Sequence, residues 1–493
     1  MICVSLARTR HGMMTAEHQA LAHKGAELVE LRVDWLSRAP ELTRLLTKRP
    51  TPVVFTCRRV ADGGRFKGSE EDRQTLLRAA IVAGVEYVDL ERDVAAKIRR
   101  YGKTKRIVSH HDFVQTPDDL EEIYASMTEL DADVLKVVTM ANSPRDCVRL
   151  LKLIVGAKIP TVAFCMGEFG LASRLLCGRY GAPFTYATFS KEREIAPGQL
   201  SFDEMKSMYR YDNIGPQTAV YGVLGDPIGH SLSPMLHNAA FRQCGLDAVY
   251  LPLRVPPDQF SETLNDFEWL DIRGYSVTIP HKEAALAKYP MCDDMVRAVG
   301  AANTVFRDSD NVRRSANTDL PAAMASLGSA MKEMESLEGK RVLLLGAGGA
   351  ARAIGFGVMQ KGAALVVASR TASRAKSLSE ELGCRTCTWE NRGSEGIDVL
   401  VNCTPVGLAP NVDDTPFQAN WLQEHMLVFD TIYNPEQTLL IKQARERGCR
   451  TVTGVEMFVR QAAAQFHLFT GKEPPIDFMR ETLRRGISAA RME

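Results

Sequence analysis

Short runs of apolar, largely β-branched residues recur from the N-terminus, and segments of helical length separate most of them. The runs lie at 2–6, 27–35, 52–58, 85–91, 106–113, 133–140, 160–167 and 184–189. Two of the intervening segments, 72–84 and 143–157, end in Gly or Gly-Ala, as helices often do. Eight strands that alternate with helices predict a (β/α)8 barrel, with an open doubly wound sheet as the alternative topology.

A polar stretch at 209–218, YRYDNIGPQT, interrupts this rhythm. We interpret it as a linker, because a new apolar run, AVYGVLG, follows it directly. Farther on, at 340–362, a strand, a glycine-rich turn and a helix follow one another in KRVLLLGAGGAARAIGFGVMQKG. The pattern therefore predicts a second α/β region after the barrel.

The composition excludes several functional classes. Of the 493 residues, 45% are hydrophobic and 25% charged, which is ordinary for a globular chain of two or three domains. The formal net charge of +1 gives no reason to expect nucleic acid or an anionic membrane as a partner. The eleven cysteines form no Cys/His cluster at zinc spacing, which indicates reduced thiols, a cytoplasmic setting and no metal site.

Polar residues stand at the carboxyl ends of the predicted barrel strands, where barrel enzymes carry their chemistry. Glu30, Arg32 and Asp34 alternate along the second strand, so we expect all three to face one side. Lys136 lies within the sixth apolar run, where its ammonium would give up hydration and so requires a partner or a function. The other candidates at strand ends are Arg58, His110, His111 and Arg174.

These residue types together favour one kind of chemistry. A buried lysine close to arginines favours its neutral amine, which can attack a ketone and form an imine. A nearby histidine can move protons at neutral pH, and arginines can hold a carboxylate through paired hydrogen bonds. Each feature alone has a simpler interpretation, such as a strand-edge lysine or a surface ion pair. Their convergence on one barrel mouth favours imine-assisted proton abstraction next to a carbonyl of a small acidic molecule.

Six motifs in order, ELRVD, FTCR, VSHHDF, DVLKVV, GLASRLLCG and IAPGQ, resemble type I 3-dehydroquinate dehydratase over residues 1–205. The resemblance implies that Lys136 forms the Schiff base, that His111 is the general acid and base, and that Glu91 orients His111. The substrate-binding residues that it implies are Glu30, Arg32, Arg58, Arg174 and Gln199, with Arg174 on the carboxylate. Ile195 stands where bacterial members usually have serine, so one hydroxyl contact on the closing loop is missing.

The second half carries a second set of polar motifs. The run GVLGDPIGHSLSPMLHNAAF places Ser231 and Ser233 near a predicted helix start, where hydroxyls bind a polyol or carboxylate, or simply cap the helix. The strand-like run YSVTIPHK ends in Lys282, and GAANTV and ANTDLPA supply Asn303 and Asp319. A lysine paired with an aspartate can stabilise and protonate an alkoxide as it forms.

The stretch VLLLGAGGAAR fits the G-x-G-x-x-G/A fingerprint between a strand and a helix. NAD-binding folds usually place an acidic residue about twenty positions later, on the ribose 2′-OH. This chain has VVASRTASR there, whose hydroxyls and arginines suit a 2′-phosphate, so we predict NADP rather than NAD. The cofactor-binding residues predicted from both stretches are Gly346, Ala347, Gly348, Gly349, Ala350, Ser369, Arg370, Thr371 and Arg374.

The motifs SLSP, VTIPHK, GAANT, NTD, GAGGAAR, NCTPVGL, DTIYNPEQT and GVEMFVRQAAAQFHLFTG resemble shikimate dehydrogenase along the second half. The resemblance implies Lys282 and Asp319 as the catalytic pair. It also implies substrate binding by Ser231, Ser233, Thr278, Asn303 and Gln461. The implied nicotinamide pocket is lined by Thr404, Pro405, Val406, Gly407, Gly454 and Met457. Ser369 stands where members often have asparagine, which weakens one adenosine-side contact and leaves the arginines in place.

The two resemblances place consecutive reactions on one chain, because the dehydratase product, 3-dehydroshikimate, is the dehydrogenase substrate. The order resembles the fused plant enzyme and some bacterial fusions. The implied function is a bifunctional enzyme of the shikimate pathway, with these small molecules and NADP as its ligands. Two alternatives stay open: a second half that prefers quinate, and a catalytically dead regulatory homologue, against which the intact Lys136 and Lys282 count.

We therefore expect an α/β chain in three parts. Residues 1–212 form the dehydratase barrel. Residues 218–320, joined by the C-terminal segment 461–493, form the substrate-binding lobe of a two-lobed dehydrogenase. Residues 321–460 form its Rossmann NADP-binding domain.

Overall fold

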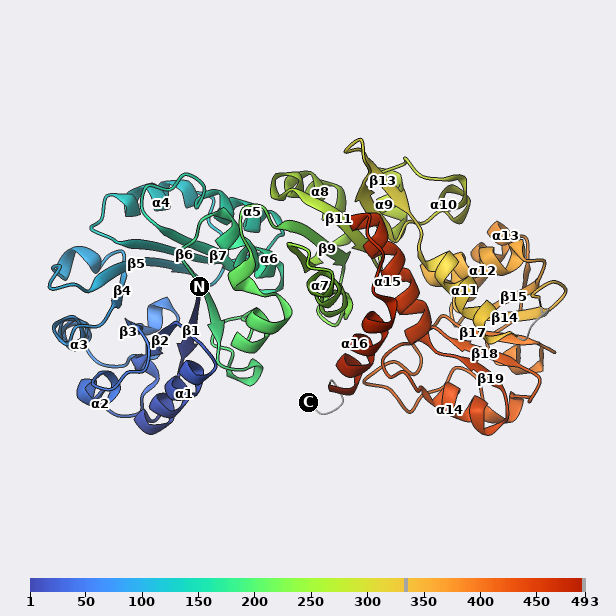
Figure 1. The fold of residues 1–493 in the computed structure, drawn as a ribbon, viewed down its shortest axis with the longest axis horizontal. Coiled ribbons are helices and arrows are strands. Elements are labelled where there is room, and N and C mark those ends of the chain that lie inside the picture. The colour runs from blue at the N-terminus through green and yellow to red at the C-terminus, as the bar shows by residue number, and fades with distance from the viewer. Residues whose placement is uncertain (332–335, 490–493) are drawn as a thin grey trace. The chain divides into compact units, whose positions relative to one another are not determined.

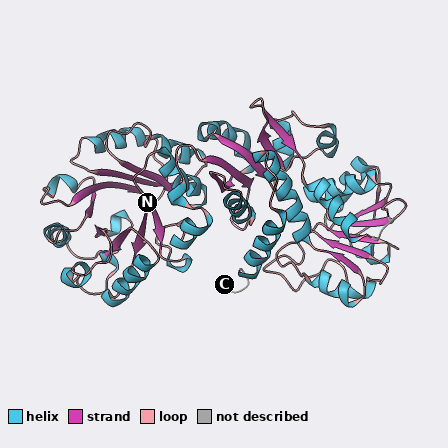
Figure 2. Ribbon diagram, in the orientation of Figure 1, coloured by secondary structure: helices cyan, strands magenta, loops and turns pink. Residues whose placement is uncertain are grey.

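The computed structural model describes residues 1–331 and 336–489 (Figures 1 and 2). These residues form two compact units. The first comprises Met1–Tyr221, Pro227–Gly229 and Asp247–Ile272, and the second comprises the rest. Among the described residues, no helix is long and apolar enough to cross a membrane.

Eight parallel strands form the N-terminal sheet. They are β1 (Ile2–Leu6), β2 (Leu28–Arg32), β3 (Val53–Thr56), β4 (Tyr87–Glu91), β5 (Lys105–Asp112), β6 (Val134–Met140), β7 (Thr161–Met166) and β8 (Thr185–Thr188). The order is β7-β6-β5-β4-β3-β2-β1-β8, so β1 pairs with both β2 and β8. A doubly wound sheet would reverse its order at a switch point. The predicted (β/α)8 barrel is confirmed, and the open-sheet alternative is wrong.

Helices follow these strands and lie around the barrel (Figure 1). They are α1 (His11–His23), α2 (Leu42–Leu46), α3 (Glu70–Val82), α4 (Leu120–Thr128), α5 (Arg145–Lys152) and α6 (Leu171–Leu176). Helix α3 shows why they form: Ser69 caps it by accepting a hydrogen bond from the Asp72 amide, at 3.1 Å. One face of α3 then buries Leu77, Ala80 and Ile81 against the barrel.

Strand β2 is shorter than the predicted run 27–35 and ends at Arg32. A 3-10 turn at Val33–Trp35 follows, so the expectation that Asp34 alternates with Glu30 and Arg32 on one strand face is wrong. The turn instead folds Asp34 back onto the arginine, whose Nε and Nη2 donate to its two carboxylate oxygens at 3.0 Å each. Asp34 thus orients Arg32 at the barrel mouth.

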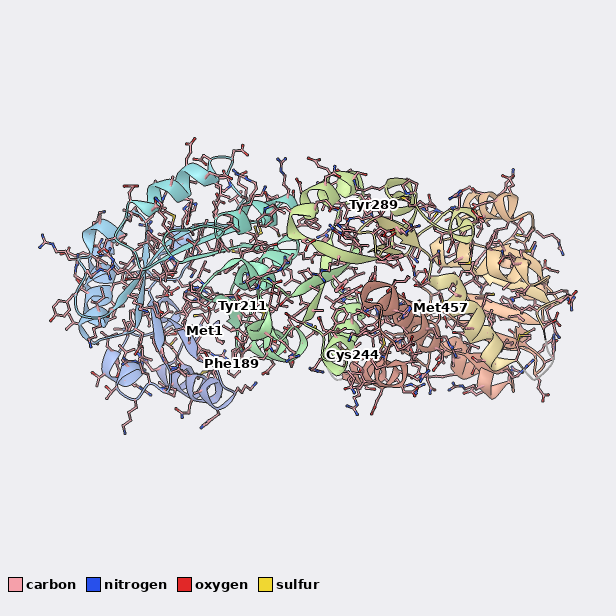
Figure 3. The ribbon with its side chains drawn as sticks, turned by 45° about the horizontal axis from the view of Figure 1, so that its top comes forward. Met1, Phe189, Tyr211, Cys244, Tyr289 and Met457 are labelled. Carbon is pink, nitrogen blue, oxygen red and sulfur yellow. The ribbon has the colours of Figure 1, made fainter. Side chains whose placement is uncertain are left out.

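The stretch 209–218, interpreted as a linker, begins inside the packing of the barrel. Tyr209 and Tyr211 are both buried. The hydroxyl of Tyr211, labelled in Figure 3, lies 3.3 Å from the Cys177 Sγ. The two tyrosines are hard to recognise as core residues in the sequence because their neighbours are polar. Only the second half of the stretch is a linker.

Two further sheets make up the second half. The first contains β9 (Ala219–Gly225), β10 (Ala248–Arg254), β11 (Ile272–Val277), β12 (Thr304–Arg307) and β13 (Arg313–Ala316), in the order β10-β9-β11-β12-β13. The second contains β14 (Arg341–Leu345), β15 (Ala364–Ala368), β16 (Arg385–Thr386), β17 (Val399–Asn402), β18 (Leu427–Asp430) and β19 (Arg450–Val452). Its order, β16-β15-β14-β17-β18-β19, reverses at β14, as in the Rossmann fold.

Ten helices of the described chain accompany these sheets: α7 (Ser233–Gln243), α8 (Phe260–Phe267), α9 (Lys282–Lys288), α10 (Asp294–Val299), α11 (Asp319–Ala330), α12 (Gly349–Gln360), α13 (Ala372–Leu382), α14 (Leu439–Glu446), α15 (Gly454–Thr470) and α16 (Ile476–Ala489). Helices α15 and α16 lie side by side, and α16 packs on α7 (Figure 1). The C-terminal segment therefore returns to the lobe that contains α7.

The sequence contains one C-x-x-C spacing, Cys384 and Cys387. The two residues flank the short strand β16 and pack into different core clusters. Those clusters hold alternate residues of β14, such as Leu344 and Leu343, so they lie on opposite faces of the sheet. The spacing is therefore a core-packing feature and not a redox motif.

Gly170 lets α6, the helix that carries Arg174, lie against the end of β7. A Cβ atom on Gly170 would be 2.5 Å from the Cys165 carbonyl oxygen. We expect Gly170→Ala to lower the free energy of unfolding of the barrel by about 1–3 kcal/mol, because α6 must move away. Urea titration followed by circular dichroism measures this change.

Gly215→Ala is the matched control, since nothing lies within 4 Å of its added Cβ and its φ is not left-handed. It should change the free energy of unfolding by less than about 0.5 kcal/mol. Equal losses in the two variants would contradict the steric account.

Candidate active sites

A pocket opens at the carboxyl ends of the barrel strands, with about 540 Å³ of space between protein atoms, part of it open to solvent. Seven of the predicted dehydratase residues line it: Glu30, Arg32, Arg58, His111, Lys136, Arg174 and Gln199. They come from six different elements or loops of the barrel. The structure therefore brings together almost the whole predicted set, as a barrel mouth does.

Lys136 is only 5% exposed, and two carboxylates lie close to its amine. Its Nζ lies 3.1 Å from Asp89 Oδ2 and 3.7 Å from Glu30 Oε1. The ring of Tyr186 lies beneath it, 4.0 Å from Nζ to the ring centroid. Arg58, one of the arginines that line the pocket with Lys136, contacts the carboxylate of Asp89.

Asp89 is a site residue that the sequence analysis missed. Its Oδ1 accepts hydrogen bonds from Ser109 Oγ at 2.6 Å, and lies 2.8 Å from Arg58 Nη2. Burial opposes ionisation, but Arg58 and Lys136 hold the pKa of Asp89 well below its usual range. The sequence could have indicated Asp89, because it lies two residues before Glu91 on β4 and therefore on the same strand face.

Of the two neighbouring histidines, only His111 lines the pocket. Burial, then Arg58 and Lys136, lower the pKa of His111 well below its usual value. The imidazole is therefore neutral at pH 7 and can accept a proton. Its ring stacks on Phe113, with 6.0 Å between centroids. His110, one residue earlier on β5, points to the other side of the strand.

Glu91 has an arginine at each carboxylate oxygen. Arg58 Nη1 donates to Oε1 at 3.1 Å, and Arg73 Nη1 donates to Oε2 at 2.8 Å. These bonds fix the carboxylate inside the network below the pocket. Its predicted role in orienting His111 stays a prediction.

Arg174 is a desolvated cation at the pocket. It is 1% exposed, its Nη1 donates to the Tyr186 carbonyl at 3.2 Å, and its guanidinium lies 4.3 Å from the Phe164 ring centroid. Burial lowers the pKa of Arg174 to about 10, so it remains charged at neutral pH. A buried cation whose guanidinium contacts a carbonyl and an aromatic ring suits the carboxylate of a ligand.

The closing loop of the pocket is tied by Gln199. Its Oε1 accepts hydrogen bonds from the Ile195 amide at 2.9 Å and the Ala196 amide at 3.3 Å. Ile195 lines the pocket in place of the family's serine. Ser5, Asp62 and Tyr186 also line it and were not found by sequence reasoning, since none belongs to a quoted motif.

The second site is built around an ion pair. Lys282, at the start of α9, places its Nζ 2.5 Å from Asp319 Oδ2, at the start of α11. Asn317 Oδ1 accepts the amide of Asp319 at 3.1 Å, which fixes the turn before α11. The Lys282 and Asp319 side chains are 14% and 10% exposed, so the pair is mostly shielded from water.

Asn303, predicted to bind substrate, holds the residue next to Asp319. Its Oδ1 accepts the Thr318 amide at 2.8 Å, and its Nδ2 donates to Thr318 Oγ1 at 2.9 Å. Gln465 of α15, which the sequence analysis missed, donates to the Asn303 carbonyl at 3.1 Å and accepts from Ser276 Oγ at 2.7 Å. One helix thus supports the strand end that carries Asn303.

The other predicted substrate residues belong to the same unit. Ser231 Oγ accepts the amide of Ser233, at 3.3 Å, where α7 begins. Thr278 follows β11, and its amide donates to the Leu224 carbonyl at 2.9 Å. Gln461 lies on α15 and donates to the Phe458 carbonyl at 2.9 Å.

The glycine turn after β14 is crowded at two of its three glycines. Gly346 has a φ of +110°, and a Cβ on it would be 2.9 Å from the Cys403 carbonyl oxygen. A Cβ on Gly349 would be 3.1 Å from Lys282 Cδ. Lys282 therefore lies beside the glycine turn. Both belong to a cleft with about 950 Å³ of space, partly open to solvent, whose lining also includes Ala347, Arg352 and Arg374.

The end of β15 meets this turn, since the Gly346 amide donates to the Ala368 carbonyl at 2.8 Å. Ser369, Arg370, Thr371 and Arg374 follow β15 at the surface. This loop offers hydroxyls and two cations and no carboxylate, which fits a ribose 2′-phosphate. The glycine turn and this loop together therefore fit NADP.

The remaining predicted cofactor residues, Thr404, Pro405, Val406, Gly407, Gly454 and Met457, lie in the loop after β17 or at the start of α15. Thr404 donates from its amide and its Oγ1 to Asn402 Oδ1, at 2.9 and 2.7 Å. Met457 is labelled in Figure 3 and packs in a Rossmann core cluster.

Family models match the chain in four stretches. Residues 2–216 match type I 3-dehydroquinase, and residues 223–305 match the shikimate dehydrogenase substrate binding domain. Residues 328–404 match shikimate/quinate 5-dehydrogenase, and residues 454–484 match the shikimate 5′-dehydrogenase C-terminal domain.

A relative from Arabidopsis thaliana carries the name bifunctional 3-dehydroquinate dehydratase/shikimate dehydrogenase, chloroplastic. It is 36% identical over 500 residues, and the alignment covers 96% of this chain and 83% of that protein. The chain belongs to this bifunctional family.

The dehydrogenase half of this bifunctional family member also has separate relatives. The NADP(+) shikimate dehydrogenase of Methanothermobacter thermautotrophicus is 37% identical, over 55% of this chain and 98% of that protein. A crystal structure of a shikimate dehydrogenase with NADP+ has a TM-score of 0.52 and 33% identity, over 55% of this chain and 96% of that chain. The Aquifex aeolicus shikimate dehydrogenase gives a TM-score of 0.50 and 32% identity, over 54% and 98%.

In the dehydrogenase half, Asp430 holds the loop after β17. It accepts hydrogen bonds from Asn402 Nδ2 at 3.0 Å, Thr438 Oγ1 at 2.7 Å and the Ile432 amide at 3.1 Å. Burial, which these bonds only partly offset, raises the pKa of Asp430 to about 6. The folded state therefore disfavours the ionised carboxylate, and its stability falls as pH rises from about 4 to about 6.

Asp430→Asn should remove this pH dependence, because the amide carries no charge. Its oxygen keeps the two bonds that Oδ1 accepts, and its NH2 can donate to Thr438 Oγ1 in place of the third. We expect the variant to exceed the wild type in free energy of unfolding by an amount that grows between about pH 4 and pH 6 and then stays constant, up to roughly 3 kcal/mol. Urea titrations at about pH 4.5 and about pH 7.5 measure the difference. A difference that is the same at both pH values would contradict the prediction.

Proposed function

We propose that the barrel dehydrates 3-dehydroquinate to 3-dehydroshikimate and that the second half reduces 3-dehydroshikimate to shikimate with NADPH. The observation that carries this proposal is the pairing of two complete sites on one chain. Lys136 and His111 line one pocket, and Lys282 lies between Asp319 and the glycine turn of the other.

In the barrel, the Lys136 amine attacks the substrate C3 ketone, and loss of water gives a protonated imine. The neutral His111 then takes a proton from C2, since the imine accepts the electron pair that this leaves. The C1 hydroxyl departs as water with the proton that His111 returns. Arg174 is proposed to hold the substrate carboxylate, and water finally hydrolyses the imine to release the lysine.

In the second half, bound NADPH supplies the hydride that the C3 ketone receives. Lys282 donates a proton to the oxygen as negative charge develops there, and Asp319 holds the lysine in place. The proposed substrate contacts are Ser231, Ser233, Thr278, Asn303 and Gln461. The proposed domain boundaries remain 1–212, 218–320 with 461–493, and 321–460.

A cytoplasmic location is proposed on one observation, the eleven free cysteines, seen in a structure that describes all of them. The Arabidopsis relative is named as chloroplastic, and a chloroplast stroma would suit reduced thiols equally well.

The test is to supply 3-dehydroquinate and NADPH to the wild-type chain and to identify the product by NMR. We expect shikimate. Lys136→Ala should abolish dehydration and leave the reduction of added 3-dehydroshikimate intact, because the amine acts only in the barrel. Lys282→Met should give the reverse pattern, with 3-dehydroshikimate accumulating.

Quinate as the product would contradict the proposed order of reactions, because the second half would then reduce the first substrate directly. Absence of turnover at both sites would favour the regulatory alternative. Loss of both activities in Lys136→Ala would contradict the independence of the two sites.

The arginines after β15 should decide the choice of cofactor. Replacing Arg370 and Arg374 with serine should raise the KM for NADPH by about tenfold or more, because two cations leave the proposed 2′-phosphate site. The KM for NADH should change little. Steady-state kinetics with both cofactors measure this, and equal losses with NADPH and NADH would rule out the assigned role.

A further inference from the structure

Arg73 is a fully buried arginine that does not line the dehydratase pocket. It lies on α3, which packs against β3 and β4, and its side chain is 0% exposed. Its Nη1 donates to Glu91 Oε2 and to the Cys57 carbonyl, both at 2.8 Å, and its Nε and Nη2 donate to Glu70 at 2.8 Å each. A cation is buried at such cost only where its partners are fixed.

From Arg73 a continuous row of alternating charges runs to the Schiff-base lysine. Arg73 binds Glu91 at 2.8 Å, and Glu91 binds Arg58 at 3.1 Å. Arg58 binds Asp89 at 2.8 Å, and Asp89 binds Lys136 at 3.1 Å. Apart from the outer partner of Arg73, every side chain in the row is at most 6% exposed, so solvent screens these interactions weakly.

Each inner member of the row divides its bonds between two opposite charges. Glu91 is shared by two arginines, and Arg58 is shared by two carboxylates. Without Arg73, the full charge of Glu91 would attract Arg58 and weaken its hold on Asp89. Asp89 would then bind the Lys136 ammonium more strongly, which opposes release of the free amine.

We propose that Arg73 is a positioning residue of the dehydratase, which acts through Glu91 and Arg58 to set the charge balance around His111 and Lys136. This inference rests on the proposed dehydratase function and adds a residue outside the pocket to it.

The proposal predicts the direction in which the pH profile of dehydration shifts when Arg73 is neutralised. The charged groups that face His111 are Arg58, Lys136, Asp89 and Arg32, from three strands and the loop after β3. Neutralising Arg73 adds one net negative charge to this enclosed set, which favours the imidazolium over the neutral base. The acid limb of the dehydratase kcat/KM profile should therefore move to higher pH.

The experiment compares Arg73→Gln with Arg73→Lys in the full-length chain. Dehydration is followed by the absorbance of the conjugated enone product across a pH series. We expect the acid limb of Arg73→Gln to rise by about half a pH unit or more. Arg73→Lys keeps the charge with fewer donors, so kcat should fall while the acid limb stays near the wild-type position.

Glu70→Gln is the matched control. It removes the outer ion pair of Arg73, where Glu70 is 41% exposed, and leaves the inner row intact. The wild-type pH profile is expected. Reduction of added 3-dehydroshikimate by each variant serves as an internal measure of correct folding elsewhere in the chain.

Superimposable pH profiles for wild type and Arg73→Gln, with wild-type dehydration intact, would overturn this inference alone. A wild-type chain that leaves 3-dehydroquinate unchanged would overturn the proposed function as well. If Arg73→Gln does not fold, Glu91→Gln takes its place. It removes the negative charge, so its acid limb should move to lower pH, and no movement would contradict the coupling.

Discussion

The structure of the barrel depends on the burial of one ammonium group. Lys136 is 5% exposed on an interior strand face, and it is tolerable there because Asp89 and Glu30 lie within 3.7 Å. Those carboxylates need cations of their own, which Arg58 supplies to Asp89. Arg58 in turn requires Glu91, and Glu91 requires Arg73. The catalytic pocket is therefore the inner end of a charge network that extends to the outer helix α3, and a change at any member redistributes the others.

Much of the barrel and most of its candidate site could be predicted from the sequence, because apolar runs and their polar ends are local features. The residues that were missed are those whose role depends on contacts across strands. Asp89 meets Lys136 only because register places Glu91 beside Ser109, and Ser109 beside Lys136, on adjacent strands. Asp34 was wrongly placed on the strand for a related reason. The strand ends at Arg32 in a 3-10 turn, which the alternating pattern does not predict.

In the second half, the glycine turn was predicted as a dinucleotide-binding fingerprint, but the residues that contact it could not be predicted. Gly346 faces the Cys403 carbonyl and Gly349 faces Lys282, contacts that join segments far apart in the sequence. Gln465 could not be predicted as a partner of Asn303 for the same reason, since it lies 162 residues later in the chain. The glycine fingerprint indicates that other groups approach the backbone of the turn closely. Only the packed structure shows which groups these are.

The two sites use lysine in opposite ways, and their surroundings differ accordingly. In the proposed dehydration Lys136 attacks a ketone as a free amine, and the pocket also holds His111, whose lowered pKa keeps the imidazole neutral. In the proposed reduction Lys282 donates a proton to the substrate oxygen, and its Nζ lies 2.5 Å from Asp319 Oδ2. Burial is greater at Lys136, with 6% side-chain exposure against 14% at Lys282. The proposed nucleophile therefore lies in the drier site, and the proposed proton donor lies in the more open one.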